Sequence, residues 1–149
     1  VGQSQIEKDR NEEIMAPYRT GIPNLHFVGH LEGEEKFRRI REAKILINTS
    51  IHEALPVTFL EALACGTLLV SCQNPDGMTS RFGIYTGPVL GDGFDKVDLF
   101  VDAVRTLIKD EARRKELSAA ACEYVKSVHG VGEFVRNTRR LIRETARRR

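Results

Sequence analysis

The chain of 149 residues has no tryptophan, few aromatic residues and three cysteines. No stretch approaches the roughly 20 consecutive apolar residues that a membrane-spanning helix needs, and no basic and apolar leader opens the chain. We therefore expect a cytoplasmic protein. Cys65, Cys72 and Cys122 are odd in number and lack C-x-x-C spacing, which argues against a disulfide framework or a zinc site. They are expected to be reduced and structural.

Two nucleotide-binding fingerprints are also missing. Neither G-x-G-x-x-G nor G-x-x-x-x-G-K-[ST] occurs, which disfavours a nicotinamide dehydrogenase and a P-loop NTPase. His26 and His30 are four residues apart, but on a strand they would lie about 13 Å from each other, too far to share one metal ion. The sequence therefore predicts no metal site and no cofactor.

Basic and acidic residues nearly balance over the whole chain, but basic residues predominate at its C-terminal end. The 23 basic and 21 acidic residues leave a net charge of +2, too balanced for a nucleic-acid-binding protein. Beyond Glu133 the balance changes, and a basic helix is expected at about residues 132–149. Its arginines are Arg136, Arg139, Arg140, Arg143, Arg147, Arg148 and Arg149. This helix is either a solvated face or an electrostatic contact with the anionic inner membrane surface, to which each basic side chain would add about 1 kcal/mol.

What is present is an alternation of strand-like and helix-like segments. Strands are predicted at residues 24–29, 44–48, 67–72 and 89–90, and Val1 with Gly2 resembles the end of another. Helices are predicted at residues 34–43, 57–65, 97–109, 111–128 and 132–143. Such alternation is typical of an α/β fold with a mostly parallel sheet flanked by helices. The strands at 44–48 and 67–72 read as buried on both faces.

The loop after the predicted strand 44–48 carries the richest chemical pattern. In open α/β sheets ligands bind beyond the carboxyl ends of the strands. Glu53 and Glu61 lie eight positions apart there, and Pro56 between them should start a helix. Glu53 then belongs to the loop and Glu61 to the second helical turn. Both carboxylates could face the space beyond the carboxyl ends of the strands and bind a ligand with hydroxyl groups at two places.

The start of the same helix offers a second feature. Leu55, the expected N-cap, has no side-chain oxygen, so the N–H groups of Val57, Thr58 and Phe59 lack a local acceptor. Amides at the positive end of a helix bind phosphate readily, and the Thr58 hydroxyl adds a donor. Water or the Glu53 carboxylate could satisfy the same donors instead.

Several segments together resemble one family. They are Asn24–His30, Lys44–Ser50, Glu53 with Glu61, Ala62–Gly66 and Leu69–Ser71. The pattern is similar to the C-terminal domain of GT-B fold retaining glycosyltransferases of family 4, the glycosyl transferases group 1. The likeness runs from Val1 to about Phe134, and its most specific part is the E-x7-E motif that leads into E-A-L-A-C-G.

The resemblance implies a Rossmann-like domain that binds a nucleotide-sugar donor facing a second domain. Residues 1–149 would be a partial C-terminal domain of this kind. Glu61 would bind the ribose hydroxyls, and Glu53 would touch the transferred sugar as the catalytic residue. The helix start would face the diphosphate, the loop 74–79 would line the sugar pocket, and a strand end would lie near the nucleobase. The remaining donor-binding positions are Pro56, Val57 and Thr58 at the helix start, and Gly29 and His30 at that strand end.

Two departures from the family pattern bear on these roles. Leu55-Pro56 stands where many members have Phe-Gly, and proline offers no N–H to the donor. The first strand, glycine turn and basic pair of the family domain would lie upstream of Val1. The fold is therefore expected to be truncated at its N-terminal side, without the acceptor-binding N-terminal domain and inactive as a fragment.

The function implied is glycosyl transfer, hexosyl or related, from a nucleotide sugar with retention and without a metal. The implied partners are the nucleotide-sugar donor, a carbohydrate or lipid-linked acceptor and the missing N-terminal domain of the same chain, with no nucleic acid. Alternatives are a non-catalytic Rossmann-like interaction module, and an epimerase or hydrolase of sugar nucleotides. Glu61 could also be a surface carboxylate paired with a nearby arginine.

Overall fold

The computed structural model describes residues 12–18, 21–91 and 93–147, so the predicted strand end at Val1 and Gly2 lies outside the described residues. The chain divides into two compact units, Val1–Glu32 and Gly33–Arg149. In the first unit residues 12–18 are helical, and residues 25–32 have no regular secondary structure. The strand predicted at residues 24–29 is therefore wrong. A strand needs a ladder partner, and no described residue pairs with this segment.

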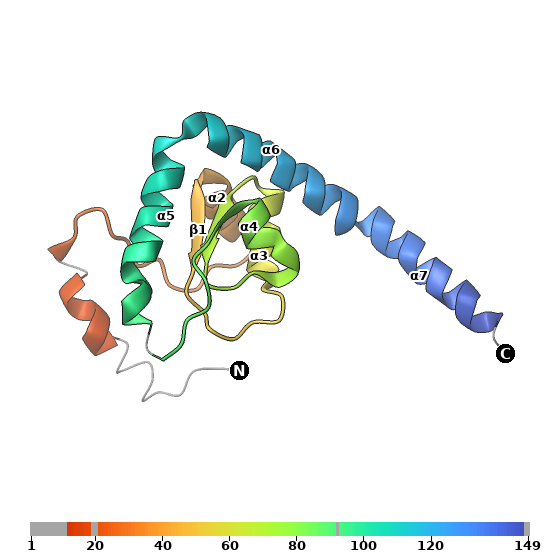
Figure 1. The fold of residues 1–149 in the computed structure, drawn as a ribbon, viewed down its shortest axis with the longest axis horizontal. Coiled ribbons are helices and arrows are strands. Elements are labelled where there is room, and N and C mark those ends of the chain that lie inside the picture. The colour runs from red at the N-terminus through yellow and green to blue at the C-terminus, as the bar shows by residue number, and fades with distance from the viewer. Residues whose placement is uncertain (1–11, 19–20, 92, 148–149) are drawn as a thin grey trace. The chain divides into compact units, whose positions relative to one another are not determined.

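The second unit contains a parallel sheet and most of the helices (Figure 1). Its elements in chain order are α2 (Gly33–Glu42), β1 (Ile45–Asn48), α3 (Val57–Ala64), β2 (Leu68–Ser71), η1 (Pro75–Gly77), α4 (Met78–Arg81), β3 (Gly83–Tyr85), η2 (Phe94–Lys96), α5 (Val97–Lys109), α6 (Glu111–Val128) and α7 (Val131–Ala146). The predicted bounds of α5 and α6 are confirmed. The predicted α2, α3 and α7 are confirmed with ends that shift by up to three residues.

In the described residues the sheet has three parallel strands in the order β1-β2-β3, which confirms the predicted α/β class. Ile45 pairs with Leu68, and Leu69 pairs with Gly83. All four residues of β2 are buried, as predicted. The same prediction is wrong for β1, where Ile47 is 52% exposed. Within the described residues β1 has a strand neighbour on one side only, and Ile47 lines an open hollow beside α5.

The third strand lies at Gly83–Tyr85, and the prediction of a strand at residues 89–90 is wrong. The Thr86 N–H still donates to the Ser71 carbonyl at 3.0 Å, and Gly87 then adopts a positive φ of 84°. This conformation, which suits glycine, turns the chain away from the ladder. Leu90 is consequently 83% exposed.

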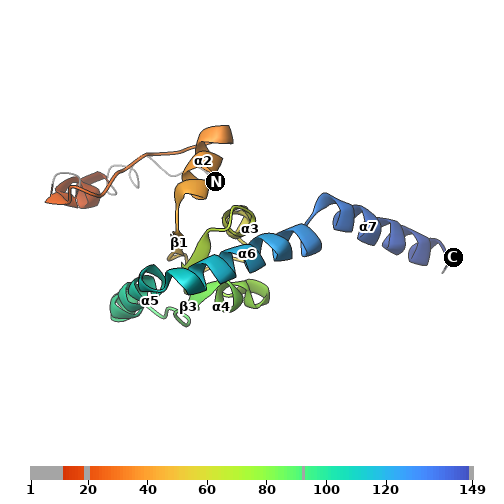
Figure 2. The same cartoon turned by 90° about the horizontal axis from the view of Figure 1, so that it is seen from above.

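Helices cover both faces of the sheet, and alternate residues of β2 point to opposite faces. Leu69 packs with Phe59, Leu63 and Ala121 of α3 and α6 in one cluster. Leu68 and Val70 pack on the other face, in a cluster that includes Ala103 and Leu107 of α5. The turned view of Figure 2 shows α3 and α5 on opposite sides of the strands. Seen this way, the core is two apolar layers around β2.

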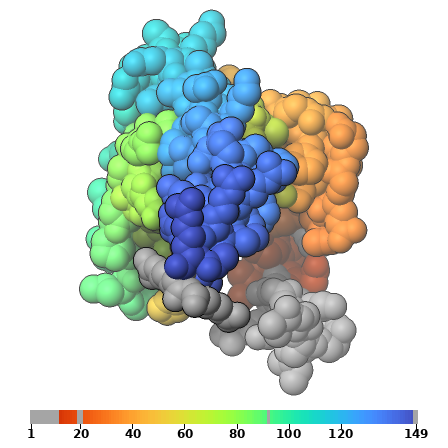
Figure 3. Space-filling model, turned by 90° about the vertical axis from the view of Figure 1, so that its right-hand side faces the viewer, coloured from red at the N-terminus to blue at the C-terminus, as the bar shows by residue number. Residues whose placement is uncertain are grey.

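The last helix, α7, has no buried residue, a property it shares with α2. α7 follows α6 after a short break and extends beyond the strands (Figure 2). In the space-filling view its surface stands at the front (Figure 3). Among the described residues, no helix combines the length and the apolar character that crossing a membrane requires.

Candidate functional site

The loops that follow β1 and β2 meet at the carboxyl edge of the sheet. The Gln73 amide donates to the Ile51 carbonyl at 2.7 Å, and the Cys72 thiol contacts the Ser50 carbonyl at 3.3 Å. The Asn48 side chain accepts the Ser50 N–H at 3.0 Å and so sets the direction in which the first loop leaves β1. These bonds fix the start of the loop that carries Glu53.

The second loop is held by its own hydrogen bonds, and the turn predicted at residues 74–77 is confirmed. The buried Thr79 hydroxyl donates to the Gln73 carbonyl at 2.6 Å. The Asn74 side chain accepts the Ser80 N–H at 3.0 Å and donates to the Ser80 hydroxyl at 2.8 Å. Asp76 has a φ of 50°, which is uncommon outside glycine. These hydrogen bonds hold the loop in one conformation beside the carboxyl edge of the sheet.

Helix α3 begins at Val57 and its N-cap is Pro56, one residue later than the predicted Leu55. Pro56 is buried and provides no capping side chain. Its carbonyl accepts the Phe59 N–H at 2.9 Å, so the prediction that this amide is unsatisfied is wrong. A proline fits at the N-cap because its fixed φ precedes the first helical residue. In the described part of the chain, the N–H groups of Val57 and Thr58 have no hydrogen-bond partner.

The two carboxylates of the E-x7-E motif stand in different surroundings. Glu53 belongs to the loop, as predicted, and is exposed. Glu61 lies in the second turn of α3, as predicted, and 17% of its side chain is exposed. Its carboxylate accepts a hydrogen bond from the Lys36 ammonium at 2.6 Å. The carboxylate is thus paired with a lysine, where the sequence suggested an arginine as the alternative.

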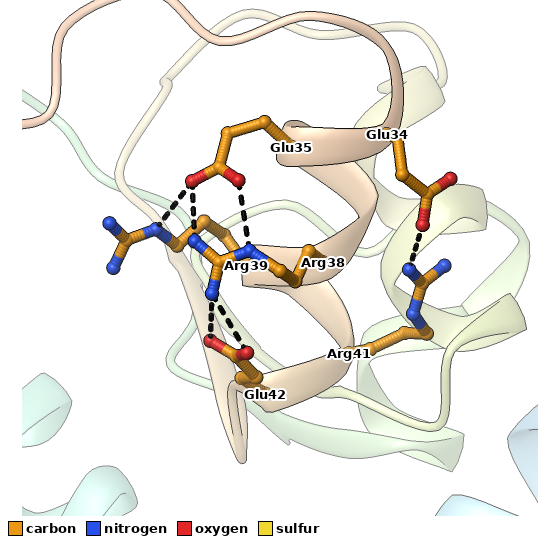
Figure 4. Close-up of polar contacts among 6 residues, drawn as sticks. All are labelled: Glu34, Glu35, Arg38, Arg39, Arg41 and Glu42. Carbon is orange, nitrogen blue, oxygen red and sulfur yellow. Dashed lines mark hydrogen bonds and ion pairs between the residues drawn. The ribbon is translucent and has the colours of Figure 1, made fainter.

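Lys36 is a residue of this region that the sequence did not single out. Lys36 lies in the first turn of α2 and Glu61 in the second turn of α3, and these two helices contact each other. Figure 4 shows the arginines of α2 engaged with the carboxylates of the same helix. Arg38 binds Glu35 at 2.6 Å and Glu42 at 2.9 Å. The Lys36 side chain instead bonds to Glu61 of α3. The sequence pattern does not indicate this pair, because it depends on how the two helices pack.

The ion pairs of α2 lower the pKa of one of its carboxyl groups. A hydrogen bond from the Arg38 guanidinium, helped by Arg39, holds the pKa of the Glu35 carboxyl below its usual value. A pKa that is lower in the folded state stabilises the fold above the ordinary carboxyl pKa, and this stabilisation is lost as the pH falls through the lowered value. At neutral pH the network therefore supports the helix that presents Lys36.

The other predicted donor-binding residues, Gly29 and His30, belong to the first unit. Gly29 has a φ of 68°. The His30 side chain is 84% exposed and contacts the Glu32 carboxylate at 3.0 Å. Because residues 25–32 form no strand, the predicted strand end at these residues is not present. Within the described ranges, no cluster of three histidine, cysteine or acidic residues could hold a metal ion.

A hollow that the sequence did not predict opens beside the loop after β1. Its volume is about 350 Å3, and its walls are mainly apolar. Ile47 and Ile51 line it from β1 and the loop, and Val97, Phe100 and Val101 line it from α5. On the same helix Leu99 and Ile108 are each 47% exposed. Phe100 packs toward the sheet, against the cluster that contains Leu68 and Val70.

The three cysteines are all unpaired, in agreement with the sequence. Burial raises the pKa of the Cys65 thiol, so at neutral pH this group remains protonated and a poor nucleophile. Cys72 is buried with its sulfur at the Ser50 carbonyl. These contacts suit structural thiols.

A known protein family matches this chain. The family model of the glycosyl transferases group 1 matches residues 2–124, which includes the sheet, the E-x7-E motif and most of α6. Comparisons with curated proteins and with solved structures return no match. The matched region is more than half of the chain and contains every candidate residue discussed above. The chain therefore belongs to the glycosyl transferases group 1 family.

Proposed function

We propose that this chain supplies the donor-binding part of a retaining, GT-B fold glycosyltransferase of family 4. The observation that carries the proposal is the E-x7-E motif placed across the start of α3, at the carboxyl edge of a parallel sheet. Family membership supports glycosyl transfer from a nucleotide-sugar donor to an acceptor. The finer assignments below are ours.

Glu61 and the first amides of α3 would bind the nucleoside diphosphate. A carboxylate can accept hydrogen bonds from both ribose hydroxyls, each contributing roughly 1.5 to 3 kcal/mol. The Lys36 ammonium, which donates to the Glu61 carboxylate at 2.6 Å, orients it for this role. The N–H groups of Val57 and Thr58, which have no partner among the described residues, would face the diphosphate. Pro56 contributes by placing the helix start, because it has no N–H.

The transfer breaks the bond between the anomeric carbon and the diphosphate oxygen. The acceptor hydroxyl oxygen forms the new bond and loses its proton, and the nucleoside diphosphate leaves with the bonding electrons. Preorganised amides stabilise the negative charge that develops on the leaving group, so we propose a transfer that does not depend on a metal ion. Glu53, exposed in the loop, would contact the transferred hexosyl or related sugar.

The remaining partners follow from a two-domain enzyme in which one domain binds the donor and the other binds the acceptor. We propose a carbohydrate or lipid-linked acceptor and an N-terminal domain of the same protein that binds it. The loop at residues 74–79 would line the sugar pocket. Activity of the present chain alone is not expected. A cytoplasmic location would give it access to nucleotide sugars.

Titration of the full-length protein with UDP, GDP and ADP tests the nucleotide site. Glu61→Ala should weaken the preferred nucleotide by about tenfold or more, as expected for the loss of one or two charge-assisted hydrogen bonds. Glu116→Ala is the matched control, since this glutamate is exposed on α6. Unchanged affinity in Glu61→Ala would remove Glu61 from the site.

Product analysis separates transfer from the other reactions of sugar nucleotides. The full-length protein, given a nucleotide sugar and candidate acceptors, should form a glycoside with the anomeric configuration of the donor. Inversion would contradict the retaining assignment. Free sugar or an epimerised nucleotide sugar as the product would instead identify a hydrolase or an epimerase.

A further inference from the structure

A basic hollow lies at the amino edge of the sheet, at the opposite end of the strands from the E-x7-E loop. Its volume is about 250 Å3. Lys44 directly precedes β1 and Leu68 begins β2, and both residues line the hollow. Every lining residue belongs to the second unit of the chain. The acceptor domain that we propose would face the carboxyl edge, which leaves this hollow outside the contact between the two domains.

Four basic side chains surround the hollow. Arg41 and Lys44 come from the end of α2 and the turn into β1, and Arg114 and Lys115 come from the first turns of α6. Among the described residues, Glu42 is the one carboxylate in the lining. Glu42 is bound to an arginine of α2, and Arg41 is bound to a glutamate of the same helix (Figure 4). The hollow therefore carries an excess of positive charge.

The remaining three cations lie around a single carboxylate at the start of α6. Glu111 is paired with Lys115 at 2.8 Å. The hydrogen bond from Lys115 lowers the pKa of the Glu111 carboxyl, and the charges of Arg114 and Lys44 add to this lowering. Lys44 has no carboxylate partner of its own in the described part of the chain. One carboxylate shared by three cations leaves most of their charge unneutralised.

Arg114 is held in place with donors to spare. One of its terminal nitrogens donates to the Leu107 carbonyl at 2.7 Å and to the Ile108 carbonyl, both at the end of α5. Within the described ranges, its other two guanidinium nitrogens have no acceptor. A guanidinium that is fixed in this way can bind phosphate oxygens with little further loss of side-chain freedom.

A hydroxyl group adds an uncharged donor to the hollow. Ser118 lies one turn after Arg114 on α6, so the two side chains face the same side of the helix. A Cβ on Gly66 would lie 2.4 Å from the Ser118 Oγ. Glycine at position 66 therefore leaves room for this hydroxyl, which has no hydrogen-bond partner among the residues that the structure describes.

We propose that this hollow binds a phosphate group, as inorganic phosphate or as the phosphate of a small monoester, through Lys44, Arg114 and Ser118. Ammonium, guanidinium and hydroxyl donors from separate elements fit the several oxygens of one oxyanion. The volume corresponds to about eight water molecules, which suits a phosphate with a small substituent and not a whole nucleotide sugar. The site is separate from the start of α3, and the proposal does not depend on nucleotide binding there.

Calorimetric titration of the full-length protein in 0.15 M NaCl tests the affinity. Inorganic phosphate and glycerol 2-phosphate are both expected to bind, and binding of the second alone would identify a monoester as the ligand. Lys44→Gln should weaken binding by about tenfold, as expected for the loss of one charge-assisted hydrogen bond. Lys126→Gln is the matched control, since Lys126 is exposed on α6. Absence of binding, or equal losses in both variants, would overturn the proposal.

Lysine acetylation followed by mass-spectrometric peptide mapping locates the bound anion. Saturating phosphate should slow the acetylation of Lys44 and Lys115, which line the hollow, and leave that of Lys126 unchanged. Lys36 reports on the nucleotide site, because it is bound to Glu61. Protection of Lys36 without protection of Lys44 would place the anion at that site and overturn the proposal. Equal slowing at all four lysines would show a general effect of the salt and would overturn it as well.

Discussion

The position of Lys36 explains how the Glu61 carboxylate of the candidate site is held in place. Its ammonium lies 2.6 Å from the Glu61 carboxylate, and the two side chains are 33% and 17% exposed. The other ion pairs of α2 join side chains of the same helix that are about half exposed or more. A partly buried pair loses less of its attraction to solvent than a surface pair does. Lys36 therefore holds α2 to α3 and orients the second carboxylate of the motif.

Replacing Lys36 should reveal this difference as a change in stability. Lys36→Gln is expected to lower the free energy of unfolding by about 1 kcal/mol, because it leaves a partly buried carboxylate without its counter-charge. Lys36→Arg should retain most of the stability. Urea denaturation followed by circular dichroism measures both.

The control for this comparison is Lys115→Gln, which removes an exposed pair with Glu111. A surface pair of this kind contributes about 0.5 kcal/mol or less. If the Lys36 and Lys115 variants lost equal stability, the contact with Glu61 would be no more than a surface ion pair.

Gly83 is a second residue with a defined structural task. A Cβ placed there would lie 1.8 Å from the backbone oxygen of Leu69. Since the obstacle is backbone in the central strand, Gly83→Ala should lower the free energy of unfolding by about 3 kcal/mol or more. Gly21→Ala is the control, because nothing lies within 4 Å of the added carbon. A Gly83→Ala protein as stable as its control, measured by thermal denaturation, would contradict the tight packing of β3 on β2.

At the scale of elements, the boundary between α5 and α6 depends on one side chain. Asp110 ends α5, and its carboxylate accepts the Arg113 N–H at 2.8 Å as the N-cap of α6. Asp110→Ala should lower the free energy of unfolding by about 1 kcal/mol, whereas Asp110→Asn should retain the cap. Thermal denaturation compares the two. Equal losses in both variants would mean that the charge of Asp110, and not its hydrogen bond, stabilises the helix.

Elements with strong local signals could be predicted from the sequence. α5 and α6 are long, the apolar residues of α5 recur at helical spacing, and Pro56 with Gly66 bounds α3 closely. β3 was not predicted because it is three residues long and begins with a glycine. That glycine is present because Leu69 approaches it, and no local pattern reports such a contact. The expected strand at residues 24–29 has a strand-like composition, but composition alone does not provide a ladder partner.

For the candidate site, the sequence predicted the positions of the two glutamates but not the ion pair that one of them forms. Pro56 placed Glu53 in the loop and Glu61 in the helix, and both positions are confirmed. The Lys36–Glu61 pair joins residues 25 positions apart. It depends on how two helices face each other, which the sequence pattern does not specify. The roles of both glutamates toward a donor remain predictions.

For the whole molecule, the helices after residue 110 contribute very unequally to stability. Ala121 of α6 is fully buried, and Tyr124 and Val125 pack against the same cluster. α7 buries none of its residues. Deletion of residues 131–149 should therefore change the free energy of unfolding by no more than about 0.5 kcal/mol. Deletion of residues 111–149 should prevent cooperative unfolding, as followed by calorimetry. A large loss of stability in the shorter deletion would show that α7 packs on the core.

The order of the strands also determines how the backbone of this domain exchanges with heavy water. The Leu68 N–H donates to the Lys44 carbonyl on one side of β2, and the Leu69 N–H donates to the Phe82 carbonyl on the other. Both sides of β2 are thus protected. Along β1, every second amide points away from β2, where the described residues provide no acceptor. Deuterium should enter these outer amides first and those of the central strand last.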